Sequence, residues 1–377
     1  MSVERREIVI IGAGPGGSSA ARAAALAGVR PLLVERDDAP GATNACGGFA
    51  GYAFRRKLEL PDEVVERVLT RTVLAVDGTR HVYGGRRPHY ISFRRLHFDT
   101  YLAQRAVAAG AELATSTRAA VLDPAARRLR LKDLRTGAER EVEADVLIFA
   151  DGPTTLAADA YGIGHRPGPR TRSAIFVELE GAWGDGETSE IVLNTAYTKS
   201  YFWLFPKRDC VWVGVGGTLT GGPSPLHARL AEFIEQRDDL RGRPIRHRGA
   251  GLVPADVSRE LVADGAMVVG DAGGLVNPLT GGGIAFALVS GAIAGRVAAE
   301  AVQAGRTDRA FLRRYCRQFH RTPHHLWLTA MGWWRRRLER RPPAEQPKAY
   351  GRMLRQYLSF FHHAHVLADW VLGSGRG

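Results

Sequence analysis

The stretch EIVIIGAGPGGSSAARAAALAGVRPLLVE, residues 7–35, decides the fold. Residues 7–12 form an apolar run rich in Ile and Val, which is typical of a buried strand. Residues 18–28 are rich in alanine and end in glycine, as a helix with a glycine C-cap does. Residues 31–35 form a second apolar run. The order of strand, glycine turn, helix and strand predicts a βαβ unit.

The glycine turn has the spacing G-x-G-x-x-G, and each glycine has its own task. Gly12 permits the tight turn out of the strand, Gly14 lets the backbone approach a diphosphate, and Gly17 lets the helix pack closely on the sheet. The helix N-terminus offers N–H groups to the same diphosphate. Glu35 ends the second strand, where its carboxylate can accept hydrogen bonds from ribose hydroxyls. An acid at this position favours FAD or NAD over NADP. The alternative is a glycine-rich turn without a ligand.

A second glycine-rich segment separates FAD from NAD. The sequence GDAGGLVNPLTGGGI, residues 270–284, follows an apolar strand. Asp271 at the strand end is placed to hydrogen-bond a ribityl or phosphate-side hydroxyl. Gly282, Gly283 and Ile284 begin a long helix whose N-terminal amides are predicted to face the electron-rich edge of a reduced flavin. Because an NAD enzyme has no use for this element, the sequence favours FAD.

The remaining segments predict an α/β protein with a discontinuous, Rossmann-type FAD-binding domain, an inserted antiparallel β-sheet domain and a helical C-terminal extension. The predicted FAD-binding domain comprises residues 1–75, 95–160 and 255–305. The predicted substrate-binding domain comprises residues 76–94 and 161–254. Residues 306–377 form the predicted helical region.

Composition limits the partners and the location. The 52 Lys and Arg residues against 39 Asp and Glu give a net charge of +13, which suits an anionic partner or reflects a solvated basic surface. No nucleic-acid-binding motif is recognisable, so we predict no nucleic-acid partner. Cys46, Cys210 and Cys316 lack the spacing of a metal site or a disulfide framework, which favours a reducing cytoplasm and no metal. We expect no signal peptide, and the longest apolar stretch, 282–295, is too short to span a bilayer.

Four segments together resemble the FAD-dependent enzymes built on the p-hydroxybenzoate hydroxylase fold. They are GAGPGG with Glu35, RLHFDTYL at 95–102, ADG at 150–152 and the segment at 270–284. The resemblance implies that Arg95 reaches toward the flavin and that the adenine lies near Ala119. With the neighbours of these motifs, the predicted cofactor site also includes Gly16, Arg36, Asp151 and Gly152.

Two further segments resemble the geranylgeranyl reductases. ACGG at 45–48 matches the Cys-Gly-Gly segment that lies beside the isoalloxazine in that family, which places Cys46, Gly47 and Gly48 in the cofactor site. YFWLFPKRDCVWVGVGG at 201–217 matches the family pattern Y-x-W-x-F-P-K followed by G-x-G. The resemblance implies an FAD-dependent reductase that saturates C=C bonds of a prenyl chain. The predicted substrate-binding residues are Tyr201, Trp203, Phe205, Lys207, Gly214 and Gly216.

The alternation of the aromatic residues agrees with this function. Tyr201, Trp203 and Phe205 share one face of a strand, because side chains at i, i+2 and i+4 point the same way. They form an apolar wall on which a hydrocarbon chain can be removed from water. Gly214 and Gly216 on the neighbouring strand are predicted to leave room for that chain. The alternative is an inter-sheet core with a glycine bulge.

The implied reaction needs a hydride from reduced FAD and a proton for the other carbon. Cys46 is the candidate proton donor, with Tyr201 and Lys207 as alternatives. A second dinucleotide unit is not evident, so transient NAD(P)H or a ferredoxin-like protein is the predicted electron donor. Two Trp residues beside an Arg cluster at 331–341 suit peripheral contact with an anionic membrane, where a prenyl lipid resides.

Three other functions compete with this one. An FAD monooxygenase or halogenase acting on an aromatic substrate would share the fold, and halogenases have a W-x-W-x-I-P element that 201–206 approaches, with Tyr and Phe replacing Trp and Ile. Quinone-linked electron transfer would need an iron–sulfur module that the sequence lacks. A nucleic-acid-binding protein with an unused nucleotide fold would be colourless, whereas a flavoprotein is yellow.

Overall fold

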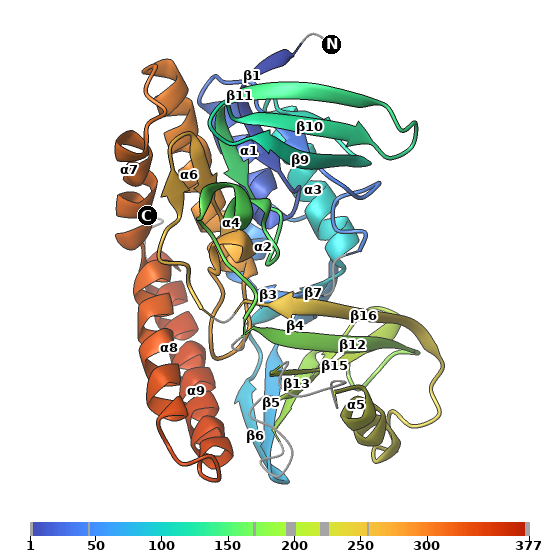
Figure 1. The fold of residues 1–377 in the computed structure, drawn as a ribbon. Helices are drawn as coiled ribbons and strands as arrows, with labels where there is room; N and C mark the ends of the chain where they lie inside the picture. The colour runs from blue at the N-terminus through green and yellow to red at the C-terminus, as the bar shows by residue number, and fades with distance from the viewer. Residues whose placement is uncertain are drawn as a thin grey trace. The chain divides into compact units, whose positions relative to one another are not determined.

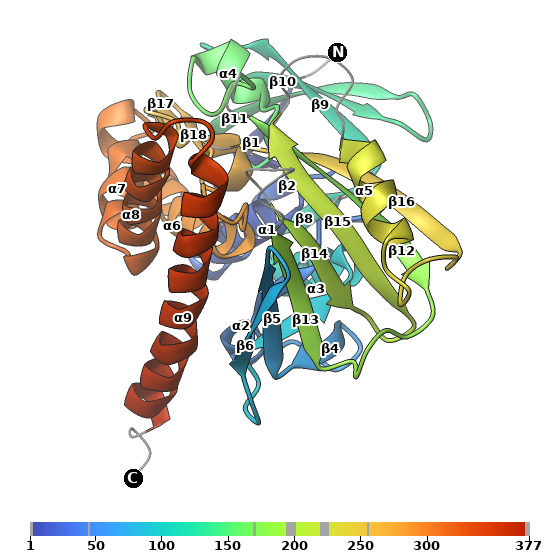
Figure 2. The same cartoon turned by 90° about the horizontal axis from the view of Figure 1, so that it is seen from below.

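The computed structural model describes residues 3–43, 46–168, 171–193, 201–218, 226–254 and 256–373. The chain divides into two compact units, each drawn from three segments. Unit 1 comprises Met1–Asn44, Arg95–Thr171 and Leu252–Trp333. Unit 2 comprises Ala45–Arg94, Arg172–Gly251 and Trp334–Gly377. Figures 1 and 2 show the elements of both units.

An 8-stranded sheet forms the centre of unit 1, with the order β17-β18-β11-β1-β2-β8 and a β9–β10 extension beside β11. The parallel strands are β1 (Glu4–Ile11), β2 (Leu32–Val34), β8 (Glu112–Ala114), β11 (Glu139–Phe149) and β18 (Ala266–Val268). The antiparallel strands are β9 (Thr117–Asp123), β10 (Arg128–Asp133) and β17 (Val262–Ala263). This is the doubly wound, discontinuous α/β arrangement that the sequence predicts.

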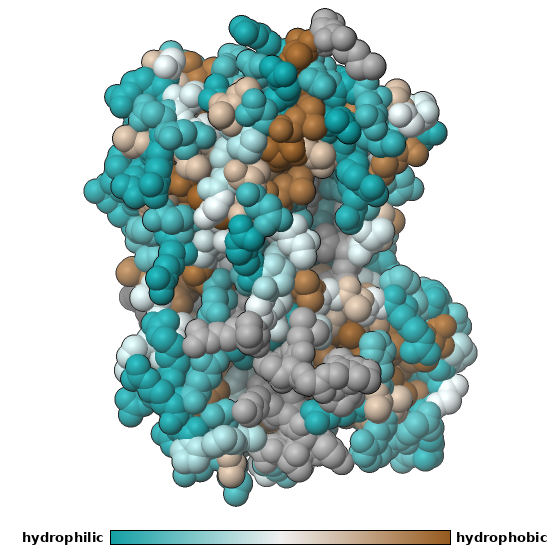
Figure 3. Space-filling model, in the orientation of Figure 1, coloured by the Kyte–Doolittle hydropathy of each residue, from teal (hydrophilic) through white to brown (hydrophobic). Residues whose placement is uncertain are grey.

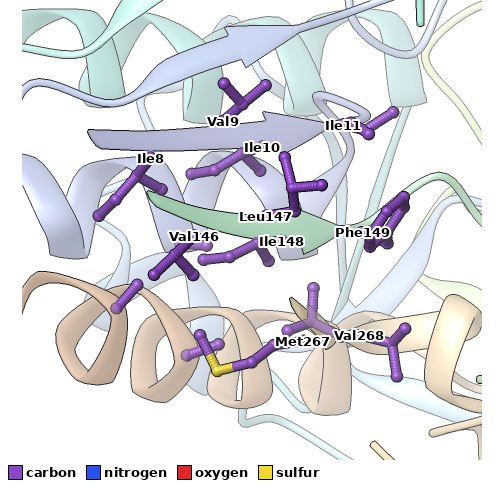
Figure 4. Close-up of a cluster of buried hydrophobic side chains, with 14 of the residues drawn as sticks. Ile8, Val9, Ile10, Ile11, Val146, Leu147, Ile148, Phe149, Met267 and Val268 are labelled. Atoms are coloured by element: carbon purple, nitrogen blue, oxygen red, sulfur yellow. The ribbon is translucent and has the colours of Figure 1, made fainter. Parts of the chain in front are cut away.

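The core of unit 1 lies on the central strands. Ile8 to Ile11 on β1, Val146 to Phe149 on β11, and Met267 and Val268 on β18 are all buried, and Figure 4 shows them side by side. Strands covered on both faces read as continuous apolar runs, which explains why these segments show no polar alternation. The core fixes the carboxyl ends of three parallel strands at one edge of the sheet.

The helices of unit 1 pack on this sheet. They are α1 (Pro15–Leu26), α3 (Arg95–Ala108), α4 (Leu156–Tyr161), η1 (Gly270–Gly273), α6 (Ile284–Gln303) and α7 (Arg309–His320). α1 and α6 lie side by side (Figure 1) with their backbones in contact: a Cβ atom at Gly291 would lie 2.1 Å from the carbonyl oxygen of Gly16. Gly295 makes the same approach to Ala20.

α6 is also the helix whose length and apolarity would suffice to cross a membrane. In the structure, 67% of its most apolar window is buried. Its contact with α1 accounts for this composition, since the inner helix of a folded core passes the same test. On the face that Figure 3 shows, polar residues predominate and apolar residues surface in small patches between them.

Unit 2 contains a 7-stranded and a 3-stranded sheet, with the orders β16-β12-β15-β14-β13-β5-β6 and β3-β7-β4. The larger sheet consists of β5 (Arg71–Val76), β6 (Thr79–Gly84), β12 (Arg172–Glu180), β13 (Thr188–Leu193), β14 (Phe202–Pro206), β15 (Cys210–Thr218) and β16 (Ile245–Val253). The smaller consists of β3 (Phe49–Gly51), β4 (Val65–Leu69) and β7 (Tyr90–Phe93). α5 (Leu226–Glu235) packs on β12 and β15, as Figure 2 shows. The other helices are α2 (Ala53–Lys57) and α9 (Gln346–Gly373), whereas α8 (Pro323–Glu339) begins in unit 1 and ends in unit 2.

The units differ from the predicted domains at residues 46–75, 161–171 and 252–254, and residues 306–377 are divided between the two units. Residues 46–75 belong to unit 2, because β5 pairs in parallel with β13 and in a hairpin with β6, and a boundary after residue 75 would cut that hairpin. Residues 306–333 belong to unit 1, because Leu312, Tyr315 and Phe319 of α7 complete its core. The Tyr315 hydroxyl donates to the Val268 carbonyl at 3.0 Å.

Candidate active site

The glycine turn of unit 1 is held by close backbone contacts. Gly12 has a φ of +97°, and a Cβ atom there would lie 2.5 Å from the Ala150 carbonyl oxygen. A Cβ atom at Gly17 would lie 1.8 Å from the carbonyl oxygen of Gly12. A Cβ atom at Gly14, in contrast, would have Nη2 of Arg95 as its nearest neighbour, at 3.9 Å. Space therefore remains over Gly14 at the N-terminus of α1, where no side chain caps the first turn.

Glu35 is anchored by the backbone. Its Oε2 accepts from the Ala13 amide at 2.7 Å and its Oε1 accepts from the Asp37 amide at 2.9 Å. Burial raises the pKa of Glu35, and the two amide bonds act in the opposite direction. Each carboxylate oxygen keeps a further lone pair for a ribose hydroxyl.

The other predicted residues near Glu35 differ in exposure. The Arg36 side chain is 64% exposed, with its Nε 3.6 Å from a carboxylate oxygen of Asp37. Ala119 lies on β9 opposite Leu131 and packs against the core of unit 1. Gly16 touches α6 rather than open space. Gly16 therefore allows α1 and α6 to pack closely. This contact does not itself support the predicted contact of Gly16 with the cofactor.

Asp151 and Gly152 follow β11 directly. Asp151 Oδ2 accepts from the Leu156 amide at 2.8 Å, whereas its buried Oδ1 has no hydrogen-bond partner among the described residues. Burial raises the pKa of Asp151 to about 6. A Cβ atom at Gly152 would meet nothing within 4 Å. An unpaired buried acceptor beside open space fits a ligand that brings hydroxyl groups.

Asp271 lies at the N-terminus of α6. A Cβ atom at Gly283, the N-cap residue, would lie 2.9 Å from Asp271 Oδ1. No side chain caps this helix, and no acidic residue occupies its first turn after Ile284. Gly282 is exposed just before it. The amides of a long helix and one carboxylate therefore meet at the edge of the sheet, in the pattern predicted for a flavin site.

Arg95 begins α3 and is fixed in place. Its Nε and Nη2 donate to the two carboxylate oxygens of Asp99 at 2.9 and 2.6 Å, and both residues are buried. Arg95 is also the charge that opposes the rise in the pKa of Asp271. Gly14, Asp271 and Arg95 thus belong to one site in unit 1. A dinucleotide with a diphosphate, a ribityl chain and a ring that gains negative charge fits this set of residues.

In unit 2, Lys207 anchors residues 46–48, which we call the Cys46 segment. Lys207 Nζ donates to the carbonyl oxygens of Gly47 (3.1 Å), Gly48 (2.9 Å) and Phe93 (3.0 Å). The Lys207 side chain is fully buried, and burial lowers its pKa to about 7. The Gly48 amide lies 3.5 Å from Cys46 Sγ. Because the three N–H groups of Lys207 are used, its predicted contact with substrate and its alternative role as proton donor do not fit this arrangement.

The predicted aromatic wall forms one face of the large sheet in unit 2. Trp203 and Phe205 are each 8% exposed, Tyr201 packs against them, and Phe176 and Trp212 complete the cluster. Phe205 stacks on Phe49 with ring centroids 4.3 Å apart. The Trp203 Nε1 atom is buried and has no hydrogen-bond partner among the described residues.

Gly214 corrects one prediction. A Cβ atom at Gly214 would lie 2.2 Å from Cζ2 of Trp203 and 2.6 Å from the Ile175 carbonyl oxygen. The missing side chain therefore makes room for the indole ring of its cross-strand neighbour, not for a substrate. Gly216, opposite Ala174, is half-buried.

Sequence reasoning misses the partners of these residues. Phe49 carries one signal, its position directly after the Cys-Gly-Gly segment, and the alternation in 172–178 places Arg172 and Phe176 on the same face.

The three cysteines form no disulfide, and Cys210 is buried with its pKa raised to about 12.

The raised pKa of Asp271 predicts how pH affects the FAD-free protein. The folded state holds a proton up to about pH 6, whereas the unfolded chain releases it near its usual value of 3.8. The free energy of unfolding therefore falls as pH rises from about 4 to about 6. Two pH units correspond to about 3 kcal/mol, and partial solvent contact reduces this to about 2 kcal/mol.

Asp271→Asn removes this loss. Urea denaturation of the FAD-free proteins is expected to show the variant about 2 kcal/mol more stable than the wild type at pH 7, with no gain at pH 4. Asp151 contributes equally to both proteins, so the difference isolates Asp271. A gain of equal size at both pH values would show that the carboxyl group does not titrate as described.

Three comparisons place these features among known proteins. A family model described as an FAD binding domain matches residues 5–182. Digeranylgeranylglycerophospholipid reductase 2 of Methanothermobacter thermautotrophicus is 35% identical over 321 residues, which cover 82% of each chain. The crystal structure of a geranylgeranyl bacteriochlorophyll reductase-like protein from Thermoplasma acidophilum has a TM-score of 0.81 at 23% identity, covering 88% of this chain and 87% of that one. The myxobacterial chondrochloren halogenase has a TM-score of 0.71 at 19% identity, covering 88% and 83%.

Proposed function

Because the chain belongs to the geranylgeranyl reductase family of FAD-dependent oxidoreductases, we propose that it saturates carbon–carbon double bonds in the hydrocarbon chain of a prenyl lipid. The observation that supports this most directly is the aromatic face of unit 2. Trp203 and Phe205 lie against the Cys46 segment: a Cβ atom at Gly47 would lie 2.8 Å from the Phe205 ring and 3.3 Å from Trp203 Nε1. An apolar surface beside the segment that approaches the flavin in this family suits a hydrocarbon substrate.

The reaction adds two hydrogens across one double bond. FAD, when bound and reduced, would supply the hydride and with it both electrons, and this chain would supply the proton for the second C–H bond. Cys46 is our candidate for the proton donor. Lys207 holds the Cys46 segment, and the Phe205 ring, stacked on Phe49, lies against Gly47. An external donor of the NAD(P)H or ferredoxin class must reduce the cofactor again.

The names of the relatives support a proposal for the substrate class. The Methanothermobacter relative acts, by its name, on a digeranylgeranylglycerophospholipid, and we propose a phosphate-bearing prenyl lipid for this chain as well. The halogenase neighbour shares the fold at 19% identity, and Tyr201 and Phe205 replace the Trp and Ile of the W-x-W-x-I-P element. The reductase is therefore the function we propose.

The test is a single anaerobic experiment. The FAD-loaded protein is reduced with dithionite, candidate prenyl lipids are added, and mass spectrometry follows the products. Products heavier by two hydrogens per saturated bond, together with reoxidation of the flavin, are the expected result. Flavin that stays reduced with every prenyl lipid under these anaerobic conditions would reject the reductase.

Gly214→Ala tests the aromatic face. The new methyl group displaces the Trp203 indole and approaches a backbone carbonyl, and overpacking of this kind costs about 1–3 kcal/mol of stability. We expect the KM for the prenyl lipid to rise about tenfold, a loss of about 1.4 kcal/mol in binding, while FAD remains bound. Gly217→Ala is the matched control on β15, because its methyl group meets only the flexible Leu226 side chain. Equal KM values in the two variants would show that Trp203 does not contact the substrate.

We also propose peripheral contact with an anionic membrane on the cytoplasmic side. α8 carries Trp333, which is 52% exposed, and the exposed residues Arg336 and Arg337, and the exposed Arg340 follows the helix directly. An exposed indole among arginines suits the interface of a bilayer that holds the lipid substrate. Cosedimentation with anionic but not neutral vesicles, abolished by Trp333→Ser, is the expected result.

A further inference from the structure

Arg172 lies on the same face of the sheet as the aromatic wall. Residues 172, 174, 176 and 178 alternate onto one face of β12, and Phe176 of this series belongs to the aromatic cluster. Across the sheet, Ala174 pairs with Gly216 and Phe176 pairs with Gly214, which in turn pairs with Trp203. The face therefore runs from aromatic rings, over the small residues Ala174 and Gly216, to a guanidinium group at its end.

A second guanidinium group, that of Arg335, acts electrostatically on Arg172. Arg335 of α8 is only 6% exposed, although its sequence neighbours Arg336 and Arg337 are exposed. Its Nε donates to Glu339 Oε1 at 2.7 Å. After burial, Arg335 is the charged group that most lowers the pKa of Arg172, so the two guanidinium groups repel each other, while Glu339 acts on Arg172 in the opposite direction.

The cluster has more positive than negative charge. Arg335 is paired with the carboxylate of Glu339, which is 36% exposed, whereas Arg172 hydrogen-bonds the neutral hydroxyl of Tyr350. Tyr350 of α9 is 1% exposed, and the ring of Tyr201 lies 6.2 Å from that of Trp203. Tyr201 also acts electrostatically on Arg172, so the hydroxyl end of the aromatic wall meets the arginine pair. Enclosed charges of one sign are stable only when an anion compensates them.

We propose that Arg172 and Arg335 bind the phosphate group of the prenyl lipid, while its hydrocarbon chain lies along Tyr201 and Trp203. Guanidinium groups suit this task, because their N–H groups match phosphate oxygens two at a time. Tyr201 and Tyr350 supply hydroxyl donors beside them. The inference rests on the proposed function, since it assigns one end of the same substrate.

The experiment compares two substrates with the same hydrocarbon chain. Dithionite-reduced, FAD-loaded enzyme is given geranylgeranyl diphosphate or uncharged geranylgeraniol, and the wild type is compared with Arg172→Met. We expect the KM for the diphosphate to rise about 10- to 100-fold, with little change in kcat and in the KM for the alcohol. Arg172→Lys, which keeps the charge but not the two-pronged geometry, is expected to fall between them. Arg352→Met, at an exposed arginine of α9, is the matched control and should match the wild type.

Two further measurements distinguish lipid phosphate binding from a structural role of Arg172 and from a site for free phosphate. The FAD-free Arg172→Met protein should melt at the same temperature as the wild type or at a higher one, because one of two repelling charges is gone. A lower melting temperature, together with an equal loss of activity toward both substrates, would show a structural role of Arg172 and overturn the inference. Inorganic phosphate should inhibit reduction of the diphosphate only weakly and competitively. Tight binding of inorganic phosphate that leaves the diphosphate reaction unchanged would mean a site for free phosphate and also overturn it.

A binding titration keeps this inference separate from the proposed function. Quenching of tryptophan fluorescence by geranylgeranyl diphosphate needs no turnover. If the wild type reduces neither substrate but Arg172→Met still weakens this binding, the phosphate site stands and the proposed reaction fails. If binding is equal in both proteins, the phosphate site is rejected whatever the reaction.

Discussion

The Gly14→Val protein is expected to fold normally and to purify without FAD. A Cβ atom added at Gly14 would meet, apart from its neighbours in the chain, only Nη2 of Arg95, at 3.9 Å. The folded chain therefore tolerates a side chain there. The same space lies at the uncapped N-terminus of α1, where a diphosphate must approach the backbone. We expect the affinity for FAD to fall at least about 100-fold, a loss of about 3 kcal/mol in binding, measured by titrating the FAD-free protein with FAD.

Two other glycines make this result specific. Gly85→Val changes a glycine that is also free of neighbours within 4 Å and should keep FAD, which controls for the loss of a glycine as such. Gly17→Ala should lose both FAD and cooperative unfolding, because its methyl group would lie 1.8 Å from a backbone oxygen. A yellow Gly14→Val protein with unchanged FAD affinity would place the diphosphate elsewhere.

Lys207→Met is expected to lower the rate of prenyl reduction at least about 100-fold while FAD remains bound. The substitution removes the charged donor that the carbonyl groups of Gly47, Gly48 and Phe93 share, although the Gly48 carbonyl keeps its bond from the Phe93 amide. A hydrogen bond to a charged group contributes about 1.5–3 kcal/mol. The Cys46 segment then loses its anchor, whereas the glycine turn and Asp271 belong to unit 1 and are unaffected. Single-turnover reoxidation of reduced flavin by a prenyl lipid measures the effect.

The pH dependence distinguishes this clamp from a loss of folding. Above about pH 7 the Lys207 ammonium loses a proton and retains two donors for three carbonyl groups, so the wild-type rate should decline as pH rises through 7. Lys207→Met should lack this decline. Lys57→Met, at an exposed lysine of α2, should behave as the wild type does. If Lys207→Met reduced the prenyl lipid at the wild-type rate, the clamp would have no part in the reaction.

Local sequence patterns predict those elements of the fold that depend mainly on contacts between residues close in the sequence. The βαβ unit, the helix after Gly283 and the aromatic alternation of Tyr201, Trp203 and Phe205 each depend on residues within one or two turns or strands, and the structure contains them. Family resemblance adds the Cys46 segment and the aromatic strand as two functional motifs, but not the contact of Phe205 with Gly47.

Contacts between distant segments could not be predicted. A lysine after a strand is normally exposed, and the burial of Lys207 depends on carbonyl groups of residues 47, 48 and 93 that the fold brings together. The parallel pairing of β5 with β13 sets the unit boundary, although each strand alone has no signal for its partner. The sequence suggests an opening at Gly214 because the direction of the Trp203 ring cannot be inferred from alternation.

The backbone contact between α1 and α6 has a consequence for biosynthesis. Gly291 and Gly295 close over the helix that carries the glycine turn, and β18 pairs with β11 only after most of the chain has left the ribosome. Until then the nascent chain exposes the edge of β11 and the alanine face of α1. A fragment that ends at residue 182 would have the same exposed surfaces permanently, so we expect flavin loading to follow the synthesis of β18 and α6.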